Sequence, residues 1–147
     1  MRDATERAVS LLKREGATLA VVAGDEIVVS HERGVAPLLA LLEGEDSGRW
    51  SGLCAADRVV GAAAAHLYAL LGAAEVWAPV MSQQAVGVLE AAGISVVAET
   101  VVGGIVNRAG TGPCPMEAAV AGIEDSGEAL AAIRAKRSEL AQNTRRP

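Results

Sequence analysis

Hydrophobic and polar residues follow a helical period in some segments and form short β-rich runs in others. Residues 4–14 keep their apolar positions on one face, which predicts an amphipathic helix. Two apolar runs, 17–22 and 26–30, flank a Gly-Asp pair and predict a β-hairpin. The chain therefore begins with a helix followed by two antiparallel strands.

The rest of the chain alternates predicted helices and strands. Helices are expected at 37–42, 56–71, 82–91, 113–122 and 125–141, and strands at 74–80, 94–98 and 101–106. The strand–helix–strand order in the middle predicts a right-handed parallel crossover. The pattern as a whole predicts an α/β fold of three α/β/α layers, with a mixed sheet between helices. One domain is expected over 1–142, followed by a frayed tail at 143–147.

Composition narrows the classes of function. Apolar residues make up 51% of the 147 residues, enough for a core, whereas aromatics make up 2% and the formal net charge is −5. Few aromatics and no basic stripe disfavour nucleic acid as a partner. The charged N-terminus is unlike a signal peptide, and no apolar run is long enough to cross a membrane. With two cysteines far apart, we expect a cytoplasmic protein without a disulfide scaffold.

The first candidate site lies at the start of the helix expected at 56–71. Cys54, Asp57 and Arg58 would lie at its N-terminus, where free backbone N–H groups and the helix dipole favour a carboxylate, a thiolate or a bound phosphate. Asp57 is a candidate catalytic residue there, and Cys54 and Arg58 are candidate ligand-binding residues. The alternative is that Asp57 is a plain helix cap and Cys54 a small buried side chain.

The second candidate site is a polar, glycine-rich loop that precedes a helix. Its candidate residues are Asn107, Arg108, Thr111, Gly112, Cys114 and Glu117. Glycine lets a ligand approach the backbone closely, and Arg108 suits a phosphate or carboxylate. Cys114, a candidate nucleophile, is expected to have a lowered pKa beside a helix N-terminus, and Glu117 suits a capping interaction. An ordinary loop that leads into a helix, with glycine and proline at the turn, explains the same residues equally well.

Isolated polar residues provide weaker candidates. His31 could act as an acid or base with Arg33 as an anion contact, although a solvent-facing turn is favoured. Ser82 follows a strand and opens a helix, a usual position for ligands in α/β folds, but it also suits a simple cap. His66 lies in an apolar helix, which indicates a satisfied, partly buried side chain rather than a ligand.

Three segments together resemble a known family. They are CAADRVVGAAA at 54–64, NRAGTGPCPME at 107–117 and HERGVAPL at 31–38. They resemble an uncharacterised prokaryotic family, a domain of unknown function with a cytidine deaminase-like fold, over about residues 8–123. The resemblance implies that two helix starts face one cleft, lined by Asp57, Ser82 and the loop 108–114.

The zinc chemistry of deaminases does not fit these residues. Zinc deaminases carry His or Cys with Glu at one helix start and Pro-Cys-x-x-Cys at the next. Here the second helix begins Met81-Ser82-Gln83-Gln84, and a catalytic zinc needs three protein ligands. We therefore predict no zinc, no other metal or cofactor, and no hydrolytic deamination.

Three functions remain open. The first is a zinc-free domain that binds a small molecule, nucleotide or nucleotide-sugar, with phosphate at the helix starts. The second is a thiol enzyme that uses Cys114, assisted by His31 or Asp57. The third is a non-catalytic regulatory or scaffold domain, whose flat alanine-rich helices favour a homodimer. The residues leave open whether the chain is an enzyme.

Overall fold

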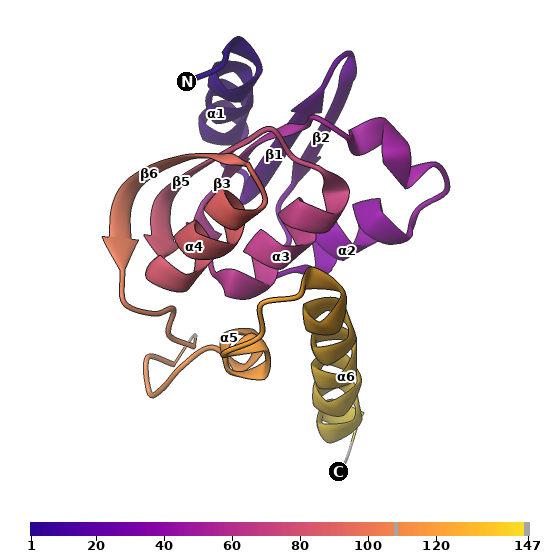
Figure 1. The fold of residues 1–147 in the computed structure, drawn as a ribbon, viewed down its shortest axis with the longest axis vertical. Coiled ribbons are helices and arrows are strands. Elements are labelled where there is room, and N and C mark those ends of the chain that lie inside the picture. Colours follow the sequence, from indigo (N-terminus) through magenta and orange to yellow (C-terminus); the bar gives the residue numbers. More distant parts are fainter. Residues whose placement is uncertain (108, 146–147) are drawn as a thin grey trace.

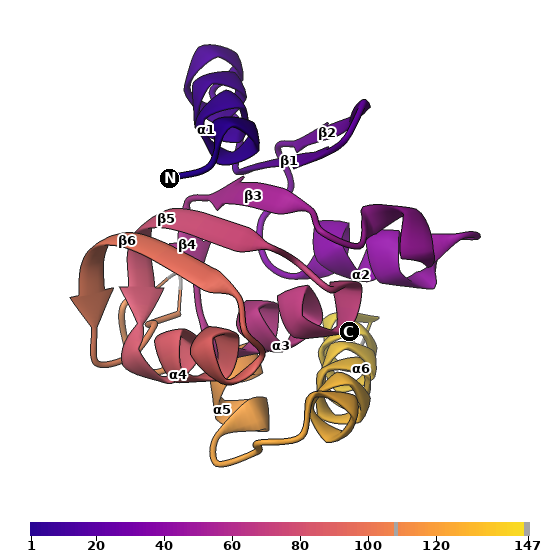
Figure 2. The same ribbon diagram turned by 45° about the horizontal axis from the view of Figure 1, so that its top comes forward.

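A mixed sheet separates two unequal helical layers (Figures 1 and 2). The computed structural model describes residues 1–107 and 109–145, and within them six strands form this sheet. The strands are β1 Leu19–Ala23, β2 Glu26–Ser30, β3 Cys54–Asp57, β4 Val59–Val60, β5 Glu75–Ser82 and β6 Ser95–Val102. The helices are α1 Asp3–Glu15, α2 Ala36–Glu43, the 3₁₀ turn η1 Ser47–Trp50, α3 Ala62–Leu71, α4 Gln83–Ala91, α5 Pro115–Val120 and α6 Ser126–Arg145.

The strand pairing is antiparallel on one side of the sheet and parallel on the other. β1 pairs antiparallel with both β2 and β3, whereas β5 runs parallel to β3, β4 and β6. β3 and β4 share one register along β5, since Cys54 lies opposite Glu75 and Val59 lies opposite Val80. The gap between these two short ladders falls beside Pro79, which has no backbone N–H to donate. The predicted hairpin and parallel crossover are both confirmed.

The larger core lies between the sheet and the helices α2, α3, α4 and α6 (Figure 2). The first turn of α3, Ala62–Ala65, is buried, and its small side chains allow a close approach to neighbouring elements. Leu38, Leu67 and Tyr68 fill the space between α2, α3 and the sheet, and each is at most 1% exposed. Gly72 ends α3 in a left-handed conformation at φ 76°, which glycine adopts without steric cost.

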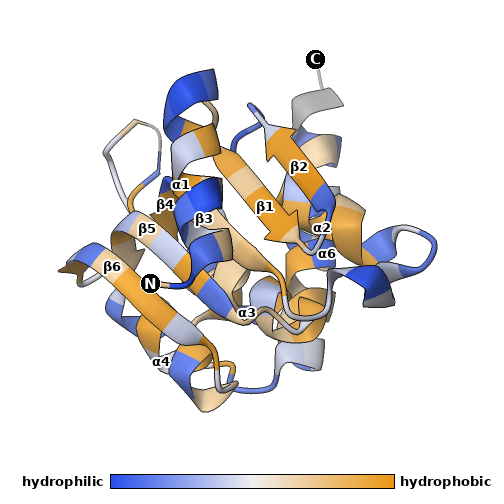
Figure 3. Ribbon diagram, turned by 90° about the horizontal axis from the view of Figure 1, so that it is seen from above, coloured by the Kyte–Doolittle hydropathy of each residue, from blue (hydrophilic) through white to orange (hydrophobic). Residues whose placement is uncertain are grey.

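The opposite face of the sheet is covered by α1 alone. Leu12 and Ala8 on α1 pack with Ala56 and Trp77 of the sheet in a second, smaller core. Figure 3 views this face and shows α1 over the middle strands, while β2 and β6 lie to either side of it. The predicted mixed sheet with helices on both faces is therefore confirmed.

The prediction of a helix at 56–71 is wrong for residues 56–61. Residues 54–57 form β3, Gly61 is extended, and α3 begins only at Ala62. The physical reason is pairing: β3 is hydrogen-bonded between β1 and β5, and an alanine-rich strand buried on both faces lacks the alternation that reveals a strand in the sequence. Cys54 and Asp57 are consequently strand residues and do not lie at a helix start.

Two further boundaries differ from expectation. The strands expected at 94–98 and 101–106 form one strand, β6, because the ladder with β5 continues through Thr100 and Val101. The last helix, α6, extends to Arg145 rather than ending near Ala141, since neither glycine nor proline interrupts this stretch. Among the residues that the structure describes, no helix has the length and apolarity needed to cross a bilayer.

Candidate functional site

A cleft of about 350 Å³ lies where β5 and β6 end. It is lined by Ser82, Gln84, Gly103, Gly104, Ile105, Pro113, Glu117, Ala118 and Ala121. The carboxyl ends of parallel strands are where α/β sheets bind ligands most often. Two sequence-predicted residues, Ser82 and Glu117, lie in its wall, so this cleft is the candidate functional site.

Ser82 lies at the junction of β5 and α4. Its side chain is buried, and its Oγ accepts a hydrogen bond from the backbone N–H of Ala85 at 3.1 Å. The predicted helix cap is confirmed, and the hydroxyl proton can still be donated to another group. On the first turn of α4, Gln84 donates from Nε2 to the carbonyl oxygen of Val120 at 3.3 Å. Gln84 belongs to the helix start Met81-Ser82-Gln83-Gln84, a usual position for ligands, but only Ser82 was predicted as a site residue there.

Glu117 lies on α5 but binds the N-terminus of a different helix. Its carboxylate oxygens accept hydrogen bonds from the backbone N–H groups of Ala62 at 2.6 Å and Ala63 at 3.0 Å. The sequence predicted a capping interaction at the start of the helix that carries Glu117, but the structure places it at the start of α3 instead. Gly61 makes this possible, because a Cβ atom there would occupy the space of the carboxylate. A glycine directly before an alanine run was the only available signal for this close approach.

The polar loop before α5 is closed by bonds within itself. The Asn107 N–H donates to the Gly112 carbonyl at 2.8 Å, and Val106 forms a bridge with Pro113. The Asn107 side chain bonds Thr111 twice, accepting from its N–H at 3.0 Å and donating to its Oγ at 3.1 Å. Ligand binding by Asn107, Thr111 and Gly112 stays a prediction, and Arg108 lies outside the described residues.

Cys114 precedes α5 and is a half-buried free thiol. Its backbone N–H donates to the carbonyl oxygen of Ile105 at 2.9 Å, which holds the two sides of the loop together. Pro113, its neighbour, lines the cleft. Cys114 itself is not among the residues that line the cleft, and its nucleophilic role stays a prediction.

Asp57 forms a second polar centre under the sheet face that α3 covers. Its carboxylate oxygen accepts a hydrogen bond from the Tyr68 hydroxyl at 2.7 Å. Burial of the carboxyl group raises the pKa of Asp57 to about 7, and hydrogen bonds from Tyr68 and from two backbone N–H groups oppose part of that rise. The pKa of Tyr68 is also raised, by burial and by the adjacent carboxyl group. Some other atoms of Asp57 remain in contact with solvent.

The cleft and the Asp57 centre are separate, which corrects the expectation of one cleft lined by Asp57 and Ser82. Tyr68 follows Ala62 by six residues, which is about 9 Å along a helix. Asp57 thus meets α3 well beyond its first turn and does not line the cleft. A carboxyl group with a pKa near neutrality is nevertheless suited to exchange protons, as acidic or basic catalytic groups are.

Arg58 and Cys54 also lie away from the cleft. The guanidinium of Arg58 donates to two carbonyl oxygens at the end of α1, that of Ala17 at 3.0 Å and that of Leu12 at 3.5 Å. Cations stabilise helix C-termini, so this contact explains Arg58 without a ligand. Cys54 is buried in the sheet opposite Glu75. Both were predicted beside a helix start because that helix was expected six residues too early.

Each of the two histidines contacts a backbone carbonyl oxygen through Nε2. His66 is fully buried, and its ring nitrogens contact Ser126 Oγ at 2.9 Å and the Ile123 carbonyl at 3.2 Å. The prediction of a satisfied histidine is confirmed, and its burial is complete rather than partial. Burial lowers the pKa of His66, although the Ile123 carbonyl opposes this. His31 is exposed, and its Nε2 lies 3.0 Å from the carbonyl oxygen of Glu15.

Side chains that could bind a metal ion are not clustered in the described part of the chain. No group of three or more His, Cys, Asp or Glu side chains in the described part of the chain is arranged to hold a metal ion. The expectation of a zinc-free cleft stays a prediction.

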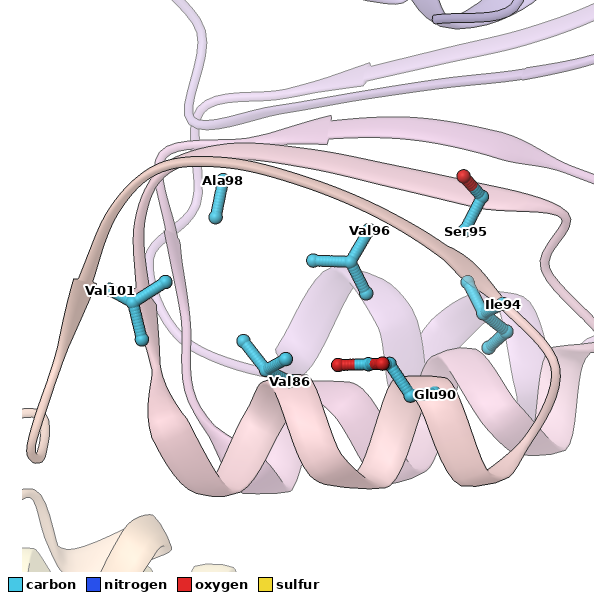
Figure 4. A pocket seen from close by; sticks show the side chains of 7 residues that line it. All are labelled: Val86, Glu90, Ile94, Ser95, Val96, Ala98 and Val101. Carbon is cyan, nitrogen blue, oxygen red and sulfur yellow. The ribbon is translucent and has the colours of Figure 1, made fainter.

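A larger hollow of about 440 Å³ lies between α4 and the edge strand β6 (Figure 4). Val86 and Glu90 of α4 face Val96, Ala98 and Val101 of β6 across it. Of the described residues that line it, Glu90 alone is ionisable. Binding sites usually combine an apolar lining with several convergent polar groups, so the smaller cleft beside Ser82 and Glu117 is the better candidate.

Comparison with known proteins agrees with this architecture. A family model described as TM1506, a domain of unknown function (DUF1893), matches residues 7–136. The chain belongs to the DUF1893 family. The crystal structure of a DUF1893 family protein, TM1506 from Thermotoga maritima, superposes with a TM-score of 0.80 at 22% identity, covering 95% of this chain and 91% of that one. This likeness shows that the DUF1893 domain has the same fold. Comparison with curated proteins gives no match.

Proposed function

We propose that this DUF1893 domain is a zinc-free, cytidine deaminase-like domain that binds a nucleotide or nucleotide-sugar in the cleft beside Ser82 and Glu117. The observation that carries the proposal is that the cleft lies at the start of α4 and that Glu117, in its wall, occupies the start of α3. α4 begins in the cleft wall, and α3 begins at the amides that Glu117 binds. Backbone N–H groups at helix starts are well suited to phosphate, and the Glu117 carboxylate occupies those of Ala62 and Ala63 when no ligand is bound.

The remaining lining fits the other parts of such a ligand. Ser82 and Gln84 supply a hydroxyl and an amide that can bond to sugar hydroxyls or to a base edge. Ile105, Pro113 and Ala118 add apolar contact, and Gly103 with Gly104 leaves the backbone accessible. The volume of about 350 Å³ lies within the range of about 300–1,000 Å³ that is usual for small-molecule sites.

Titration with adenosine, adenosine monophosphate and uridine diphosphate glucose, followed by amide NMR, tests the proposal. We expect the two phosphate-bearing compounds to shift the resonances of Ser82, Gln84 and Gly104. Gly104→Leu should weaken binding about tenfold or more by filling the cleft. Gly48→Leu is the matched control, since both glycines have open space where a side chain would begin and neither has a positive φ. Equal binding by both variants would refute the location, and no binding by any compound would favour the scaffold function.

A further inference from the structure

The short helix α5 lies across the starts of two other helices. Glu117 binds the first-turn amides of α3, and the Val120 carbonyl accepts a hydrogen bond from Gln84 on the first turn of α4. Ala118 on α5 and Ala121, which directly follows this helix, line the cleft. α5 is therefore a wall of the cleft that is attached to the starts of both α3 and α4.

The position of this wall depends on its attachments. A six-residue helix has too few internal hydrogen bonds to be stable by itself, so contacts with the rest of the protein must hold it. The described contacts are packing against α6 and α3, the buried side chain of Val120, and the hydrogen bonds named above. Glu117 provides the only charged contact among them in the described part of α5, and hydrogen bonds to charged groups are the stronger kind.

We infer that α5 is a movable wall of the cleft, fastened by Glu117 and released when an anionic group of the ligand replaces that carboxylate on the Ala62 and Ala63 amides. The inference rests on the proposed function, because it assigns a place to the phosphate of the ligand. A phosphate carries more charge and more acceptor oxygens than a carboxylate, so it can compete for the same amides. Once displaced, the Glu117 carboxylate is repelled by the bound phosphate, which favours movement of α5 away from α3.

Gly61 offers a way to displace Glu117 without removing its charge. A Cβ atom at position 61 would overlap the carboxylate, and the contacted atoms are the far end of a flexible side chain. The backbone at Gly61 is extended, at φ −100° and ψ −178°, which alanine also adopts. Gly61→Ala should therefore unfasten Glu117 while the net charge and the backbone of α3 stay as they are.

Hydrogen exchange in the absence of any ligand tests whether the hydrogen bonds of Glu117 hold α5 in place. We expect amides of α5, in peptides covering 115–123, to exchange about tenfold or more faster in Glu117→Ala and Gly61→Ala than in the natural chain. Glu124→Ala is the matched control, because it removes one negative charge from an exposed residue nearby. Unchanged exchange in both test variants would overturn the inference and would leave the proposed function standing.

Titration with inorganic phosphate tests whether a phosphate can bind the Ala62 and Ala63 amides in place of the Glu117 carboxylate. At constant ionic strength phosphate should raise the unfolding temperature of Glu117→Ala, whose amides are vacant, more than that of the natural chain. The double variant Gly61→Ala/Glu117→Ala should not respond, since the new Cβ occupies the same space. Equal stabilisation of the single and double variants by phosphate would refute the replacement of the Glu117 carboxylate by phosphate on these amides. In the natural chain, nucleotide binding that leaves exchange in α5 unchanged would overturn the inference alone, whereas fast exchange in the variants without any nucleotide binding would overturn the proposed function.

Discussion

Replacing Asp57 with asparagine should remove most of one pH dependence of stability. Asparagine has nearly the same shape as a protonated aspartic acid, and its carbonyl oxygen can accept the hydrogen bond that Tyr68 donates at 2.7 Å. It cannot ionise. The variant therefore imitates the protonated form of Asp57 at every pH.

The sign of the effect follows from the raised pKa of Asp57. The pKa is about 7 in the folded protein against 3.8 for a free side chain, so between these values the folded state holds a proton that the unfolded state has released. Raising the pH through this window favours unfolding. The window from pH 5 to the folded pKa spans about two units, worth roughly 3 kcal/mol at about 1.4 kcal/mol per unit. Because Asp57 keeps some contact with solvent, we expect about 2–3 kcal/mol.

Urea unfolding at pH 5, 6, 7 and 8.5 measures this difference when the natural chain and Asp57→Asn are compared at constant ionic strength. Other titrating groups, His66 included, are present in both proteins and cancel. The natural chain should lose stability relative to Asp57→Asn as the pH rises to 8.5. Tyr68→Phe removes the donor to the ionised carboxylate, so it should raise the pKa of Asp57 further. Parallel pH profiles for the natural chain and Asp57→Asn would refute the assignment of a buried, neutral Asp57.

Three other residues give sharp expectations. Arg58→Ala should lower the free energy of unfolding by about 1–2 kcal/mol, because the end of α1 loses its cation, yet leave nucleotide affinity unchanged; weaker binding would contradict its location on the α1 side. His66 has a lowered pKa, so the unfolded state takes up a proton first and stability should fall as the pH drops below about 6.5; His66→Asn should flatten that part of the urea-unfolding profile. The thiol hypothesis predicts faster alkylation of Cys114 than of a model thiol by mass spectrometry, with buried Cys54 as the slow internal control; a rate equal to the model thiol argues against it.

Local signals predicted much of the fold. The hairpin has a Gly-Asp turn between two apolar runs, and α4 has a serine cap after an apolar strand, so both are encoded within a few residues. The segment 54–61 has no such signal. Its alanines and valines suit a helix or a strand, and the choice is made by pairing with β1 and β5, which are distant in the sequence.

The sequence predicted some residues of the site but not the contacts that these residues make. Ser82 and Glu117 were recognised because polar residues at element boundaries are commonly caps or ligands. The partner of Glu117 was not predictable, since Ala62 precedes it by 55 residues and the signal was only Gly61. The raised pKa of Asp57 depends on burial, which the neighbouring elements provide only once α3 has packed on the sheet, and the hydrogen bond from Tyr68 on that helix opposes part of the rise.

The two carboxyl groups that meet α3 differ because the helix offers them different surroundings. At its first turn, free amides bind the carboxylate of Glu117 as they would bind a phosphate. Two turns later the amides are used within the helix, and Asp57 finds a single hydroxyl in a buried setting that favours its neutral form. The carboxylate of Glu117 and the carboxyl group of Asp57 thus meet different turns of one helix. The separation predicts that Glu117→Ala changes nucleotide affinity whereas Asp57→Asn, measured at the same pH, changes stability and leaves affinity as it was.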